Sequence, residues 1–263
     1  MAERLYLYAI VDSAVVRSHG AIGLGHPPSE VCVLPVDGLG VAVSRTTRGD
    51  FPADEDELLT YEKTLEALLR DYTVLPFGYG TSTACEADLH DLIAASRHEI
   101  DAALTRLRGR VEEGLKVFWL KDAVRRELES RFGRLPDPSA GGLDYDRIVQ
   151  VGQQVQGLVD EWKAHFVPEI IRALEPISVD WCEAEPIGVR MLFNGAFLLP
   201  RQAEPAFLER VHVLDRRYGN RLQFRCVGPL PPFNFLHLRL VPPAANDDVA
   251  TAEVVVTEEE QPT

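Results

Sequence analysis

The sequence predicts an α+β protein of two domains, the second with a ferredoxin-like order of elements. Short, β-prone apolar runs alternate with long segments whose apolar residues recur at helical spacing. In the second half the predicted order is strand, helix, strand, strand, helix, strand, which is the split βαβ arrangement. The first half follows a related plan, with a Gly- and Pro-rich loop where the first crossover helix would stand. We therefore expect a modified α+β sandwich there.

The first domain is expected to span residues 1–109. Its predicted elements are a buried strand (5–11), a loop (12–30), two strands (31–36 and 39–44), a helix (51–72), a strand (73–77) and one long helix (84–109). Asp37-Gly38 between the second and third strands is a strong hairpin signal. Gly109 is expected to end the long helix.

The second domain is expected to span residues 110–241, with a helical insertion at 121–174. Its predicted elements are strands at 110–120, 176–186, 189–200 and 221–228, helices at 121–132, 144–174 and 204–219, and a loop at 133–143. Pro168 is expected to kink or restart the second helix, because proline removes a backbone donor. Residues 242–263 carry six acidic residues and no basic one, which predicts a flexible acidic tail.

Composition narrows the class of partner. The chain has 263 residues, is 46% hydrophobic and carries a net charge of −14, so it can bury a core but lacks the basic surplus that nucleic acids or anionic membranes attract. No run approaches the roughly 18 apolar residues of a membrane span. The four cysteines fit no zinc spacing and are expected to be packed, reduced thiols, typical of a cytoplasmic protein.

The stretch "TVLPFGYGTST" (73–83) resembles a ligand-binding loop but lacks the chemistry of one. No lysine follows its glycines, and Glu86 and Asp88 would repel a phosphate at the next helix. We interpret it as a strand that turns at Gly78 and Gly80 into the long helix, with Thr81, Ser82 or Thr83 as N-cap.

No motif indicates catalysis, a metal or a cofactor. A His-Glu-x-x-His motif is absent, and His90 and His98 are too far apart along one helix to share an ion unaided. A Gly-x-Ser-x-Gly elbow is absent too. A catalytic triad can be scattered along a chain, so spacing alone does not exclude one. We predict no catalytic residue, no metal ligand and no cofactor.

Three stretches in series carry a family resemblance. They are "LYLYAIV" with "GLGVAVS"; "YEKTLEALLRDYTVLPFGYGTST" continuing to "RVEEGLKVFWL"; and "NGAFLLP" closing on "GPLPPFNF". Together they resemble the gas vesicle protein F/L family over residues 4–237. The matching positions are Tyr61, Pro76, Gly78, Gly80, Thr81, Glu112, Gly114, Lys116, Asn194, Phe197, Gly228, Pro229, Pro232 and Phe233. Gly78-Tyr79-Gly80 replaces the Arg-Phe that many members have, and Phe233 replaces a tyrosine.

The resemblance implies a non-enzymatic gas vesicle accessory protein. Such a protein binds the hydrophobic shell protein and other gas vesicle accessory proteins, and it supports nucleation or assembly as a passing factor or a minor component of the vesicle. It binds no nucleic acid and does not insert into membranes. Most of the matching positions are expected to serve backbone geometry. A sheet edge or an apolar groove would provide the contact.

Two other classes of function stay open on the residues alone. Ferredoxin-like domains also serve as small-molecule regulatory modules, which a ligand-dependent melting shift would reveal. An unrecognised hydrolase would need a serine or cysteine whose alanine variant loses a measured activity.

Overall fold

The computed structural model describes residues 3–134, 145–238 and 240, and these residues form two compact units. Unit 1 holds the described residues up to Glu112 and those from Pro229 onward, and unit 2 spans Glu113–Gly228. The sequence places the boundary near residue 109 and assigns 229–241 to the second domain, whereas the structure groups the described part of that segment with unit 1. The predicted acidic tail, 242–263, lies outside the described residues.

Unit 1 is built on a six-stranded sheet. Its elements are β1 (Arg4–Val11), β2 (Arg17–Gly23), β3 (Ser29–Val36), β4 (Leu39–Thr46), α1 (Glu55–Leu69), β5 (Val74–Pro76), β6 (Ser82–Thr83), α2 (Glu86–Ala95), α3 (Arg97–Leu107) and η3 (Phe233–Phe235). The strand order is β2-β3-β4-β1-β5, with β6 pairing with β1. The pairings around β1, β3 and β4 are antiparallel.

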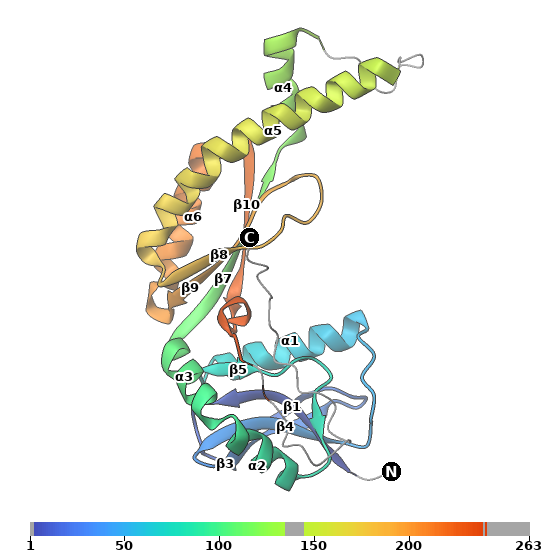
Figure 1. Ribbon diagram of the computed structural model, residues 1–263, viewed down its shortest axis with the longest axis vertical. Helices are drawn as coiled ribbons and strands as arrows, with labels where there is room; N and C mark the ends of the chain where they lie inside the picture. Colours follow the sequence, from blue (N-terminus) through green and yellow to red (C-terminus); the bar gives the residue numbers. More distant parts are fainter. Residues whose placement is uncertain (1–2, 135–144, 239, 241–263) are drawn as a thin grey trace. The chain divides into compact units, whose positions relative to one another are not determined.

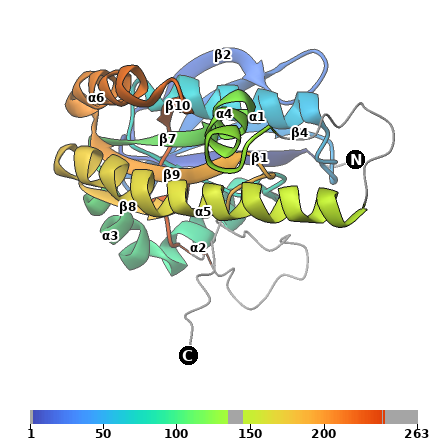
Figure 2. The ribbon, with the colours of Figure 1, turned by 90° about the horizontal axis from the view of Figure 1, so that it is seen from above.

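Helices cover both faces of this sheet. Figure 2 shows α1 and the α2–α3 pair on opposite sides of β1 and β4. A strand covered on both faces must be apolar along its whole length, and every residue of β1 after Arg4 is buried. This explains why "LYLYAIV" is a continuous apolar run.

Three local predictions for unit 1 are wrong. β2 lies inside the predicted loop, where it pairs with β3. The predicted long helix is two helices, α2 and α3, which meet at Ser96. The N-cap of α2 is Cys85 rather than one of the three predicted hydroxyl residues; Ser82 and Thr83 pair with β1 instead, and the Thr81 hydroxyl bonds back to the Gly78 carbonyl.

Unit 2 has the predicted ferredoxin-like plan. Its elements are β7 (Arg110–Trp119, entering from unit 1), α4 (Lys121–Phe132), α5 (Tyr145–Leu174), η1 (Glu175–Ile177), β8 (Asp180–Glu183), β9 (Met191–Pro200), η2 (Arg201–Ala203), α6 (Glu204–Tyr218) and β10 (Leu222–Leu230). The strand order β10-β7-β9-β8 places the first and third strands at the centre. The α+β class is thereby confirmed.

Two helices pack on the sheet of unit 2. Phe207 of α6 contacts Phe197 of β9, with ring centroids 5.2 Å apart, and Phe166 of α5 contacts Tyr218 of α6 at 5.1 Å. Figure 1 shows α5 and α6 side by side. Pro168 does not restart α5, which is a single helix of 30 residues (Figure 2).

The cysteines are less buried than predicted. None of the four forms a disulfide; Cys85 is exposed, and Cys32, Cys182 and Cys226 are half-buried. In the described part of the chain, no helix is both long and apolar enough to cross a membrane.

Candidate functional site

The turn at residues 77–81 is held by a cluster of tyrosines in unit 1. Tyr61 on α1 donates a hydrogen bond to the Phe77 carbonyl, and the Gly80 amide donates to the Tyr6 hydroxyl at 2.9 Å. The Tyr8 ring stacks on Tyr61 at 6.2 Å. Burial raises the pKa of Tyr6 and Tyr61 well above its ordinary value. These phenols therefore stay protonated. The Tyr61 hydroxyl acts as a donor, the Tyr6 hydroxyl acts as an acceptor, and both rings pack in the cluster.

An ion pair lies beside this tyrosine cluster. Arg48 forms a two-bonded ion pair with Glu57, and Tyr79 donates to the same carboxylate at 2.9 Å. The hydrogen bonds from Arg48, the larger effect, and from Tyr79 lower the pKa of Glu57. Tyr79 lies between Gly78 and Gly80, and its hydroxyl joins the turn to α1.

Gly80 has a left-handed backbone conformation, which favours glycine. Its φ is +84°, a region that other residues enter at a cost of about 1–3 kcal/mol. We expect Gly80→Val to lower the free energy of unfolding of unit 1 by about 2 kcal/mol, because valine is branched at Cβ. Chemical denaturation followed by circular dichroism measures this loss. A Gly80→Val protein that is fully stable but has lost its binding partner would instead make the turn a contact site.

Two distant matching segments meet at Glu112. The Glu112 carboxylate accepts hydrogen bonds from the backbone amide of Asn234 at 2.9 Å and from its side-chain amide at 2.5 Å. Glu112 is 2% exposed, and burial, only partly offset by these bonds, raises the pKa of Glu112 to about 6. Pro232 caps the short η3 helix that presents Asn234, and Phe233 lies in it. Two hydrogen bonds thus join the start of β7, at Glu112, to the η3 segment of "GPLPPFNF".

In unit 2 the matching residues lie on β7, β9 and β10. Phe197 is fully buried among aromatic rings. The Asn194 side chain donates to the Glu185 carbonyl at 3.0 Å. Gly114 on β7 faces Val227 on β10, whose carbonyl oxygen would be 3.4 Å from an added Cβ. Lys116 is half-exposed on β7.

The last matching residues lie on edge strands or turns. Pro76 pairs with Ala9 at the end of β5, and Pro229 lies near the end of β10. Thr81 bonds to the Gly78 carbonyl through both its amide and its hydroxyl. The structure therefore gathers the predicted residues into separate structural groups, not into one site.

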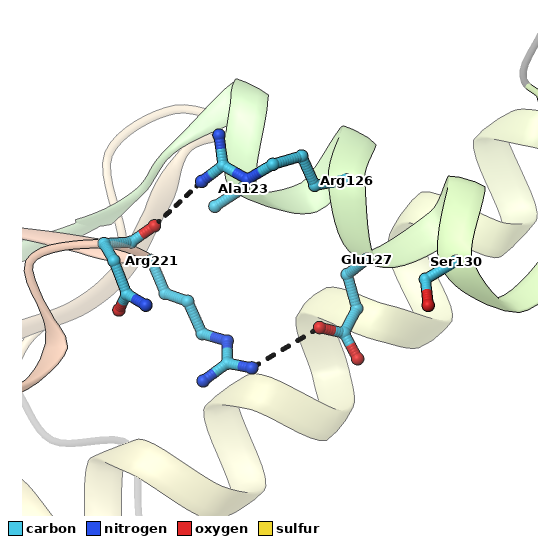
Figure 3. Close-up of a pocket in the computed structure, with 6 residues that line it drawn as sticks. Ala123, Arg126, Glu127, Ser130 and Arg221 are labelled. Carbon is cyan, nitrogen blue, oxygen red and sulfur yellow. Dashed lines mark hydrogen bonds and ion pairs between the residues drawn. The ribbon is translucent and has the colours of Figure 1, made fainter.

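One surface hollow of unit 2 lies beside α4. A cavity of about 150 Å³ is lined by Ala123, Arg126, Glu127, Ser130, Asn220 and Arg221. The Arg126 side chain donates to the Asn220 carbonyl at 3.2 Å. Figure 3 shows the Arg221 side chain pointing toward Glu127, and the two form an ion pair at 3.5 Å. A neighbouring hollow of about 330 Å³ shares Glu127 and Arg221 and adds Trp162, Phe166 and Tyr218. The two hollows adjoin at Glu127 and Arg221, and together they form a groove lined by ion pairs and aromatic rings.

This groove holds charged side chains that are already paired. Its arginines already have carboxylate or carbonyl partners, and no serine–histidine or cysteine–histidine hydrogen bond joins the described residues that line it. Among the residues that the structure describes, no three histidine, cysteine, aspartate or glutamate side chains are arranged to hold a metal ion.

One residue with unusual surroundings was not singled out by the sequence. Glu113 is 1% exposed, and both of its carboxylate oxygens lack a hydrogen-bond partner among the described residues. The signal was present: Val111, Leu115, Val117 and Trp119 define the apolar face of β7, and strand alternation places Glu113 on it.

The relatives of this chain are gas vesicle proteins. It is 27% identical to gas vesicle protein F of Dolichospermum flosaquae over 90% of this chain and 99% of the relative. It is 20% identical to gas vesicle protein F of Haloferax mediterranei over 91% and 96%. The crystal structure of GvpF from Anabaena sp. shares the fold, with a TM-score of 0.73, 23% identity and coverage of 90% of this chain and 99% of that one.

A family model covers nearly the same span as the motifs. The model described as gas vesicle synthesis protein GvpL/GvpF matches residues 4–237. That span includes all of the matching positions in both units, from Tyr61 to Phe233. The chain therefore belongs to the GvpL/GvpF family of gas vesicle synthesis proteins.

Proposed function

We propose that this protein is a non-enzymatic accessory protein that binds the hydrophobic shell protein of gas vesicles and supports vesicle nucleation or assembly. The family match over residues 4–237 carries the proposal. Most of the matching residues lie in turns, hydrogen-bonded segments or core, which favours recognition by other parts of the surface. A shell subunit with large apolar faces would aggregate in water unless a soluble partner held it.

The start of α5 offers an apolar surface for such a partner. Tyr145, Ile148 and Val149 are 75%, 52% and 40% exposed, and residues 148–159 contain no charged side chain. Exposed apolar side chains grouped on one helix mark interaction sites more often than scattered ones do. An apolar partner helix could lie along this stretch without having to desolvate a charge.

The edge of the unit 2 sheet offers a second route. β8 is an edge strand that pairs with β9 from Asp180 to Glu183. The Ala184 amide bonds to the Asn194 carbonyl, so alternation points the amide of Glu183 away from β9. A partner strand could add at this edge.

A capture experiment with the shell protein tests the proposal. We expect the purified protein to co-sediment with shell protein and to reduce its aggregation. Glu183→Pro should reduce capture if a strand adds to β8, because proline removes the outward-facing donor. Ile148→Asp should reduce capture if the start of α5 is the contact, and Ile187→Asp, at an isoleucine that is 71% exposed in a loop of the same unit, is the matched control.

The outcomes separate the routes from the proposal itself. Loss of capture in one variant identifies its surface. If wild-type protein captures no shell protein and leaves its aggregation unchanged, the proposed function is wrong.

A further inference from the structure

Glu113 is a carboxylate in an apolar setting. It lies on β7 between Val111 and Leu115, on the face that carries the core of unit 2. Neither of its oxygens meets a donor among the described residues. A buried carboxylate without donors is costly when ionised, because nothing replaces its lost hydration.

On the β10 side, the residue over this carboxylate is Gly228, which has no side chain. A Cβ placed on Gly228 would lie 2.5 Å from the Glu113 Cδ, so the carboxyl group occupies the space of a side chain at position 228. Gly228 is itself exposed, and it belongs to β10, an edge strand of the sheet. A small displacement of this end of β10 would therefore admit water to the carboxylate.

The neighbours of Glu113 favour the neutral acid. Glu204, the first residue of α6, acts on it as a second negative charge, and Cys226 on β10 is the thiol that faces it. β9, the other strand beside β7, has no titratable residue in Met191–Pro200. In the described part of the chain, no cation is among the groups that act on Glu113.

We propose that Glu113 is a proton switch: the protonated acid keeps the Gly228 end of β10 closed on β7, and loss of the proton opens it. The open state hydrates the carboxylate and frees backbone groups of β10 near Gly228. The device is independent of the shell-protein contact proposed above. It would couple the edge of unit 2 to the pH of its surroundings.

The direction of the pH effect follows from burial. Burial, with a smaller contribution from Glu204, raises the pKa of Glu113 to about 7. A raised pKa of an acid stabilises the closed state below its ordinary value near 4.5, and that stabilisation is lost as the pH rises through about 7. A carboxyl group that binds its proton more tightly in the closed state than in the open state shifts the closing equilibrium by the same factor, so each unit of the pKa rise changes that equilibrium about tenfold.

Hydrogen exchange of the full-length protein between pH 5 and pH 8 tests the switch. We expect protection of the β10 amides near Gly228, corrected for intrinsic exchange, to fall at least about tenfold over this range. In Glu113→Gln the fall should be lost or much smaller, because Glu112, the other carboxylate with a raised pKa in this range, bonds to Asn234 rather than to β10. Glu185→Gln, at an exposed carboxylate of the same unit, should follow the wild type.

A second measurement keeps the test decisive if Glu113→Gln folds poorly. Carbon-13 NMR of the wild-type Glu113 carboxyl group should show a titration midpoint within about one pH unit of 7. A midpoint below about pH 5.5, or β10 protection whose pH dependence is the same in wild type and Glu113→Gln, would overturn the proposal.

Discussion

Phe197→Ala is expected to lower the free energy of unfolding of unit 2 by about 3–5 kcal/mol, the usual cost of deleting a buried phenylalanine. Phe197 is fully buried on β9, one of the two central strands. Its ring stacks on Trp181 with centroids 6.3 Å apart and contacts Phe207 of α6 at 5.2 Å. Removing it would leave a cavity where the sheet meets the helix, which rigid aromatic neighbours cannot fill.

Tryptophan fluorescence measures this loss for unit 2 alone. All three tryptophans of the chain, Trp119, Trp162 and Trp181, lie in unit 2, so a urea titration followed by their emission reports on that unit. Ile187→Ala is the control, because Ile187 is exposed in a loop, and surface changes cost within about 0.5 kcal/mol. A loss below about 1 kcal/mol for Phe197→Ala would show that the unit repacks around the gap.

Elements with strong periodicity could be predicted from the sequence, whereas elements stabilised by a neighbour could not. β9 and α6 have apolar patterns that match their burial. β2 has the sequence "RSHGAIG" and is mostly exposed, so its own pattern is that of a loop. Its strand conformation comes from pairing with β3, which no local signal encodes.

The break at Ser96 has a similar origin. The apolar pattern continues across it, from Leu92 to Ile100, and therefore predicts one helix. In the structure the Arg97 side chain bonds to the Asp37 carbonyl in the β3–β4 turn. This contact joins residues 60 positions apart in the sequence. Tertiary contacts of this kind can override the local helix propensity that predicts one continuous helix.

Of the two buried glutamates, Glu113 could be identified from the sequence pattern alone, whereas the hydrogen-bond partner of Glu112 could not. The resemblance identified Glu112 as a matching position, but its partner Asn234 is 122 residues away. Spacing alone cannot reveal such a pair. Glu113 could have been found by counting, since one acidic residue interrupts an otherwise apolar strand face.

Gly40→Ala is expected to destabilise unit 1 by about 3 kcal/mol, near the upper end for overpacking. Gly40 lies on β4, where it pairs with Val11 of β1 and Pro35 of β3. A Cβ there would lie 2.1 Å from the Ser13 backbone carbonyl oxygen and 2.5 Å from a methyl of Val33. Side chains can rotate away from such contacts, but a carbonyl can retreat only if the backbone after β1 moves.

Hydrogen exchange of the β1 and β4 amides measures this effect within unit 1. Gly49→Ala is the matched control, because no atom lies within 4 Å of its added Cβ; its amide protection should be unchanged. Equal protection in Gly40→Ala and wild type would mean that the chain at Ser13 yields freely. In that case glycine at position 40 would not be required for the close approach of the chain after β1.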